Sequence, residues 1–226
     1  MALPEYEQIA RFDRSKTSAL STNLPVVEEA DASGRVAALY DHFKSHFGRP
    51  DVPGILKCFA THPPLLEHMM ALSESLIFSE GFLTRRHKEM IATLVSSQND
   101  CAYCADSHGF MLRMNGGSAE TLCAIQENKL RSPSLSEAEQ ALLTFVEKIN
   151  GNSQAIGPAD ILSIREAGWD DAQIAEAIHV AALFATFNRV VNAFGLPSQG
   201  LLPLYESQVA NSSPESAGLH TAQKGE

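Results

Sequence analysis

Apolar residues recur along this chain at the spacing of a helix, and strict alternation never persists for the length of a strand. The segment 36–47 keeps its apolar side chains on one helical face, and Gly48 follows as a residue that tolerates a left-handed helix exit. Helices with apolar faces are stable when they bury those faces against one another. The sequence therefore predicts an all-α, sheet-free fold.

Residues that start or stop helices divide the rest of the chain. Proline suits a first helical turn, Ser, Thr and Asp suit the cap before it, and glycine suits the exit. The expected helices run from Pro63-Pro64 to Gly81, from Thr84 to Asn99-Asp100, from Cys101 to Gly116-Gly117, from Ser118 for a short stretch, from the Ser136–Glu139 capping box onward, from Gly157-Pro158 to Gly168, and from Asp171 to Phe194.

Composition indicates one globular domain. Of the 226 residues, 44% are hydrophobic and 19% are charged, which predicts a packed core and argues against a disordered chain. We expect residues 31–204 to form a single helical domain. Residues 1–30 resemble a loosely structured arm, and the polar composition of residues 205–226 predicts a flexible tail.

Charge and hydropathy argue against several classes of partner. The net charge of −10 lacks a compensating basic stripe, so nucleic acid is not an expected partner. The acidic first 30 residues resemble neither a signal peptide nor a transit peptide. The longest uninterrupted apolar stretch, Val180–Ala185, is far short of a membrane span. We expect a cytoplasmic protein that does not bind membranes.

The chemically informative segment contains Cys101, Cys104 and His108. At positions i, i+3 and i+7 of one helix, these three side chains share a face. Neighbours at i and i+3 lie roughly 5 to 6 Å apart, which suits a disulfide. The first turn of a helix favours a thiolate, most strongly at Cys101, whereas His108 lies one turn from Cys104 and can exchange its proton.

Glu89 lies twelve positions before Cys101 and is out of phase with it on a continuous helix. It reaches the cysteine site only if the chain breaks at Asn99-Asp100 and the two helices pack side by side. In that arrangement Glu89 could orient His108 or receive its proton.

The pattern of Glu89, Cys101, Cys104 and His108 resembles the signature of the alkylhydroperoxidase D-like branch of the carboxymuconolactone decarboxylase family. Residues 47–114, including Pro53-Gly54-Ile55-Leu56, are similar to the peroxidase-related subgroup of that family. With a weaker likeness on either side, the resemblance covers roughly residues 34–195. The resemblance implies an alkylhydroperoxidase D-like helical bundle. It also implies a homo-oligomer, a trimer or hexamer, and the broad apolar face of residues 177–187 likewise favours self-association.

The resemblance further implies a thiol peroxidase that needs no cofactor. Cys104 would attack a hydroperoxide or another small-molecule substrate and become a sulfenic acid, and Cys101 would condense with it to a disulfide. A separate thiol donor would then reduce the pair, with His108 and Glu89 as the proton relay. This chain has Tyr103 between its cysteines, where the best-studied peroxidase of the family has a histidine.

Three alternatives stay open for the cysteine pair. It could act as the switch of a non-catalytic redox sensor or binding module, or the chain could be a decarboxylase-like lyase, although that branch generally lacks the pair. Cys101, Cys104, His108 and Glu89 could also bind zinc, but no second Cys or His pair is nearby, so no metal is expected. Cys58 and Cys123, among apolar neighbours, are expected to be buried small hydrophobes.

The remaining candidates are substrate-binding residues. Tyr103 is one of them, although Tyr103 and Asp106 point away from the cysteine face by helical phase, which is more typical of solvated or interface positions. Asn188 and Arg189 could bind an anionic group of a substrate, although an ordinary ion pair between helices is the more common role of such an arginine.

Overall fold

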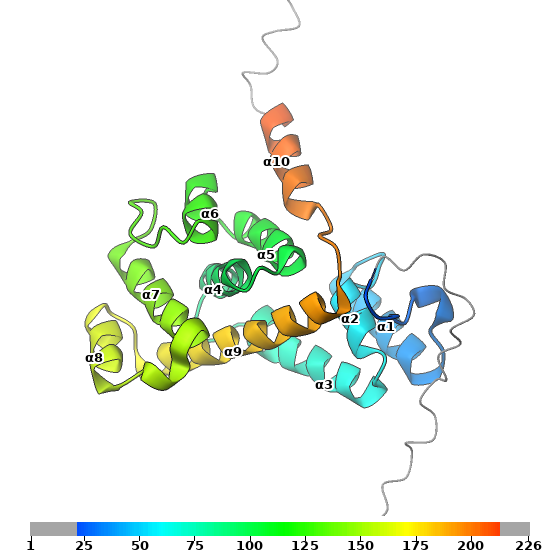
Figure 1. Cartoon of the computed structure of the whole chain (residues 1–226). Coiled ribbons are helices and arrows are strands. Elements are labelled where there is room, and N and C mark those ends of the chain that lie inside the picture. The colour runs from blue at the N-terminus through cyan, green and yellow to red at the C-terminus, as the bar shows by residue number, and fades with distance from the viewer. Residues whose placement is uncertain (1–21, 213–226) are drawn as a thin grey trace, which may run out of the picture.

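The computed structural model describes residues 22–212, and every regular element among them is helical (Figure 1). This confirms the all-α prediction. The ten α-helices are α1 (Gly34–Phe47), α2 (Gly54–Phe59), α3 (Pro63–Ser73), α4 (Arg85–Gln98), α5 (Ala102–Met114), α6 (Ala119–Gln126), α7 (Glu137–Asn152), α8 (Pro158–Glu166), α9 (Asp171–Phe194) and α10 (Leu201–Ser212).

Helix α4 lies at the centre of the larger part of the fold. Figure 1 shows it almost end-on, with α5, α6, α7 and α9 arranged around it. Every residue from 88 to 96 is buried, so α4 has no solvated face along this stretch. A helix in this position is held by neighbours on all sides, which makes it a rigid base for side chains at its surface.

Helices α1, α2 and α3 form a second apolar cluster beside the first. The cluster includes Tyr40, Phe43, Leu56, Phe59 and Leu66, and it packs against Phe187 and Val190 of α9. Helix α9 therefore joins the two clusters, as Figure 1 shows.

Helix α9 is also the one helix of residues 22–212 that is long and apolar enough to cross a membrane. Half of its most apolar 18-residue window is buried against the other helices. The longest uninterrupted apolar stretch, Val180–Ala185, is much shorter than this window, because polar residues interrupt the apolar ones on both sides of it.

Most predicted helix ends are confirmed by their caps. Thr84 and Ser118 accept hydrogen bonds from the backbone of the first turn, and Ser136 forms a capping box with Glu139. Helix α9 has the predicted bounds. One helix differs, because α3 changes after Ser73 into a π-helix, Glu74–Phe78, and ends before the predicted Gly81.

Residues 205–212 of the predicted tail are helical, because they belong to α10. The Asp106 carboxylate accepts hydrogen bonds from the backbone N–H groups of Leu201 (3.0 Å) and Leu202 (2.8 Å), so it caps α10 from α5. Arg113 adds an ion pair with Glu206 at 2.7 Å. Asp106, predicted at a solvated or interface position, is thus buried by this role, which contradicts the solvated alternative.

The described part of the predicted arm, residues 22–30, packs on the domain. The backbone N–H of Asn23 donates to Phe194 O at 2.7 Å, and that of Val27 donates to Lys57 O at 3.3 Å. Residues 1–21 of the arm and 213–226 of the tail lie outside the described residues.

Candidate active site

The chain turns back on itself between α4 and α5. Asp100 adopts a left-handed conformation with φ of 50°, and the N–H of Cys101 donates to Ser96 O at 2.9 Å. Short polar residues such as Asp tolerate this conformation better than most. The break predicted at Asn99-Asp100 is therefore confirmed, and it lays α5 alongside α4.

This packing places Glu89 of α4 beneath His108 of α5. The Glu89 Oε2 atom lies 2.7 Å from His108 Nδ1, which confirms the predicted contact. Arg85, one turn earlier on α4, donates from Nε to Glu89 Oε1 at 2.6 Å. Burial alone would raise the pKa of the fully buried Glu89 carboxyl, but the charges and hydrogen bonds of His108 and Arg85 outweigh it and hold that pKa below its ordinary value.

The contact with Glu89 also determines which His108 nitrogen can act as a base. An ionised carboxylate only accepts hydrogen bonds, so Nδ1 carries the hydrogen and Nε2 keeps its lone pair. The imidazole packs edge to face against Phe184, with ring centroids 4.5 Å apart. The His108 ring is thus held at both its polar and its apolar surfaces.

The two cysteines lie where α5 begins, as predicted. Cys101 is the N-cap and Cys104 lies in the first turn, and their relative exposures are 1% and 4%. Both are free thiols. A hydrogen bond from the Cys104 thiol lowers the pKa of Cys101, while the same bond, together with burial, raises the pKa of Cys104. The arrangement therefore favours the thiolate on Cys101 and the proton on Cys104.

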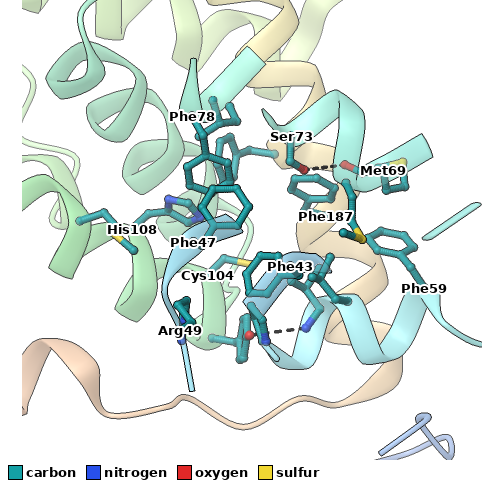
Figure 2. A pocket seen from close by; sticks show the side chains of 18 of the residues that line it. Phe43, Phe47, Arg49, Phe59, Met69, Ser73, Phe78, Cys104, His108 and Phe187 are labelled. Carbon is teal, nitrogen blue, oxygen red and sulfur yellow. Dashed lines mark hydrogen bonds between the residues drawn. The ribbon is translucent and has the colours of Figure 1, made fainter. Parts of the chain in front are cut away.

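A cavity of about 400 Å³ opens onto Cys104 and His108. Figure 2 shows both side chains among aromatic rings and methionines from α1, α2, α3 and α9. Its polar lining consists of Arg49, Ser73, Arg85 and Tyr103 besides the two reactive side chains, and its apolar lining includes Phe43, Phe47, Phe59, Phe78, Phe184 and Phe187. A ligand here would lose most of its contact with water.

The three predicted substrate-binding residues lie in different places. Tyr103, predicted at a solvated or interface position, is buried and lines the cavity, which contradicts the solvated alternative. Its hydroxyl accepts from the Ile55 N–H at 3.4 Å, and burial raises its pKa to about 12. Asn188 is fully buried and Arg189 donates to Ala185 O of its own helix, and neither residue lines this cavity.

Sequence reasoning did not identify Arg85 or the aromatic lining. The signal for Arg85 was its spacing of four from Glu89, which puts the two side chains on one helix face. The aromatic residues come from four separate helices, so only the folded chain assembles them. The prediction for Cys58 is confirmed, whereas Cys123 is exposed and the prediction of its burial is wrong.

Among residues 22–212, no group of three or more His, Cys, Asp and Glu side chains has the arrangement of a metal site. The four side chains considered for zinc instead pair as Glu89 with His108 and Cys101 with Cys104.

A comparison with protein-family models finds a match to the part of the chain that contains this site. The model of the carboxymuconolactone decarboxylase family matches residues 63–148, which contain Glu89, both reactive cysteines and His108. A comparison with curated protein sequences finds no match.

Solved structures share the fold over most of the chain. The alkylhydroperoxidase AhpD core of an uncharacterized peroxidase-related protein from Ralstonia eutropha is 25% identical, with a TM-score of 0.72 over 82% of this chain and 96% of that one. An uncharacterized peroxidase-related protein from Silicibacter is also 25% identical, with a TM-score of 0.69 over 82% and 98%.

A more distant structure is a cysteine variant of the debrominase Bmp8 in complex with 2,3,4-tribromopyrrole. It is 16% identical, with a TM-score of 0.66 over 85% of this chain and 98% of that one, and it shows a shared fold. Together, these comparisons show that residues 63–148 match the carboxymuconolactone decarboxylase family and that the chain has the fold of the alkylhydroperoxidase AhpD core.

Proposed function

We propose that this protein is a cysteine-based peroxidase that reduces organic hydroperoxides at Cys104. The observation that carries the proposal is the position of Cys104 and His108 in the wall of one apolar cavity, with Glu89 behind the imidazole. A nucleophile, a base and a group that orients the base are the parts that activated thiol chemistry requires.

The first chemical step forms a sulfur–oxygen bond. As the Cys104 sulfur attacks the terminal peroxide oxygen, the O–O bond breaks, His108 Nε2 takes the thiol proton, and that proton passes to the departing alkoxide. The products are a Cys104 sulfenic acid and an alcohol, so the peroxide is reduced by two electrons and the sulfur is oxidised by two. Glu89 stabilises the transient imidazolium.

The second step uses Cys101. Its thiolate attacks the sulfenic sulfur, a disulfide forms, and hydroxide leaves and takes a proton to become water. Two equivalents of an external thiol donor then reduce the disulfide and become a disulfide themselves. The lowered pKa of Cys101 supports this resolving role, because it keeps a thiolate available.

The cavity supports an organic substrate. A volume of about 400 Å³ lined by aromatic rings is far larger than hydrogen peroxide needs, and it suits an apolar group attached to the peroxide. We therefore propose a preference for bulky apolar hydroperoxides, with Tyr103 as part of their binding surface. We also propose cytoplasmic localisation, a soluble thiol reductant and self-association, which light scattering after gel filtration would measure.

The direct test measures turnover of cumene hydroperoxide with several thiol donors. The wild type is expected to consume many equivalents per chain and Cys104→Ser none, because the attacking sulfur is gone. Cys101→Ser is expected to permit one round and to leave a sulfenic acid on Cys104 that dimedone labels. A sulfenic adduct on Cys101 in Cys104→Ser, with none on Cys104 in the reverse variant, would reverse the two roles.

The same experiment separates the alternatives. A redox sensor would consume one equivalent and stop in every donor tested. A decarboxylase-like lyase would leave the peroxide intact. Stoichiometric zinc in protein purified without chelator, lost on Cys104→Ser, would instead support a metal site.

A further inference from the structure

The Asn188 side chain lies within the protein beside the cysteine pair. It is 0% exposed, and it projects from α9 toward the end of α4, where Ser96 and Asn99 precede Cys101. An asparagine in such a position needs partners for its oxygen and for both hydrogens of its amide nitrogen. Those partners determine which way the amide faces.

The oxygen of Asn188 is held by Asn99. The Asn99 Nδ2 atom donates to Asn188 Oδ1 at 3.0 Å, and the Asn99 amide is itself oriented by Asn150, whose Nδ2 donates to Asn99 Oδ1 at 3.2 Å. With its oxygen turned to Asn99, the Asn188 amide must present its nitrogen on the opposite side.

The nitrogen of Asn188 faces Ser96 and the two sulfurs. One hydrogen is donated to Ser96 Oγ at 3.0 Å, which leaves a second hydrogen. The sulfurs lie beside this part of α9, because Val191, one turn after Asn188, packs in one cluster with Cys101 and Cys104. The Asn188 side chain acts to lower the pKa of each of the two thiols. A fixed, buried N–H group aimed at a sulfur anion stabilises that anion more than water-exposed donors do.

We infer that Asn188 is a catalytic residue that donates a hydrogen bond to the sulfur anion of the Cys101–Cys104 pair. The assignment rests on the proposed function, and it replaces the substrate-anion role that sequence suggested for this residue. The donated bond supports the thiolate on either sulfur, which suits a cycle in which Cys104 attacks first and Cys101 second. The ionisable groups beside the sulfurs all come from α5: the sulfurs act on each other, Tyr103 interacts with Cys104, and His108 lines the same cavity as Cys104.

The test variant is Asn188→Asp, which keeps the shape of the side chain but replaces the N–H donor by an anionic oxygen. Asn99 can still donate to this carboxylate, and the Ser96 hydroxyl can rotate to donate as well. The matched control is Asn192→Asp, which makes the same change one turn along α9 at an exposed position that hydrogen-bonds to Asn99 O.

The readout is the titration of the cysteine pair, by thiolate ultraviolet absorbance and by the rate of alkylation with iodoacetamide, in a Cys123→Ser background. Cys58 does not interfere, because burial raises its pKa to about 12. We expect Asn188→Asp to lower the alkylation rate near neutral pH about tenfold, since each unit of pKa changes the thiolate fraction by about that factor. Asn192→Asp should match the parent.

An unchanged titration in Asn188→Asp would overturn the inference, even if peroxide turnover is intact. A shifted titration without peroxide turnover in the wild type would retain the role of Asn188 toward the thiolate and reject the peroxidase. If circular dichroism shows that Asn188→Asp is unfolded, Asn188→Ala is measured in the same way, and its titration decides.

Discussion

Glu89 carries its charge inside the protein, and that charge is shared by two partners. Arg85 and His108 each bond to one of its oxygens. A buried carboxylate without such partners would be protonated or would unfold the surrounding helices. Glu89 is therefore a structural element as well as part of the proposed relay, and its loss should affect stability as well as the proposed chemistry.

Replacing this carboxylate should change how stability depends on pH. Because the pKa of Glu89 is lowered in the folded state, its contribution is present above the ordinary value of 4.5 and is lost as the pH falls below it. We expect Glu89→Gln to lower the free energy of unfolding by about 2 kcal/mol at neutral pH. Urea denaturation between neutral and acidic pH should show a shallower acid decline in this variant than in the wild type.

Glu166→Gln, at an exposed position on α8, is the control for removing one acidic group. Parallel acid declines for Glu89→Gln and the wild type would contradict a charged Glu89 in the folded protein.

At the scale of elements, the loop before α4 is fixed by a buried ion pair. Lys88 Nζ lies 2.8 Å from Glu176 Oε1 and donates to Ser79 O at 3.1 Å, while Glu176 Oε2 accepts the Leu83 N–H at 2.6 Å. A Cβ atom at Gly81 would lie 2.1 Å from Glu176 Oε1 and 2.9 Å from Lys88 Nζ. The loop therefore requires glycine here because the pair occupies the space of a side chain.

Gly81→Ala should destabilise the protein by about 2 kcal/mol, because the two buried charged groups must move apart or lose their backbone partners. Thermal denaturation followed by circular dichroism measures the effect. Gly151→Ala is the matched control, since no atom lies within 4 Å of its added methyl group and alanine favours α7. Equal melting temperatures for the two variants would show that the ion pair does not hold the loop.

Sequence predicted the elements whose signals are local. The caps at Thr84, Ser118 and Ser136 and the break at Asp100 could be predicted because short side chains there bond to nearby backbone. Helix α10 could not, because its cap, Asp106, is 95 residues away from Leu201. Within the site, the contact between Glu89 and His108 followed from the break, whereas the cavity required the packing of α1, α2, α3, α4, α5 and α9.

At the scale of the whole molecule, the site lies between two bodies of the fold. The larger body is built around α4, and the smaller body consists of α1, α2 and α3. Cys104 and His108 come from α5 in the larger body, whereas Phe43, Phe47, Phe59 and Phe78 of the aromatic lining come from α1, α2 and the π-helix that follows α3 (Figure 2). In the proposed function, the chemistry and the selection of substrate are therefore carried by different parts of the chain. Changes in the smaller body should alter which substrate is used without removing the reactive sulfur.

Ser73→Leu tests whether the smaller body selects the substrate without affecting the reactive sulfur. Ser73 lines the cavity, and in Figure 2 it lies on a different side of it from Cys104. The larger side chain should reduce kcat/KM for cumene hydroperoxide about tenfold by occupying space, and should leave kcat/KM for hydrogen peroxide unchanged. Ser75→Leu makes the same change at an exposed position nearby and should have no effect. An equal loss for both peroxides would mean that Ser73 affects the sulfur itself.

The burial of the sulfurs also determines the order in which the peroxide and the thiol donor of the proposed cycle can bind. A disulfide between residues exposed by 1% and 4% presents almost no surface to a protein-sized donor, so the donor thiol must enter the cavity that Cys104 lines. In the proposed cycle, the oxidant and the reductant therefore bind in the same cavity one after the other, and neither can enter while the other occupies it. Initial-rate plots should be parallel, as in ping-pong kinetics, and excess of either partner should inhibit competitively against the other.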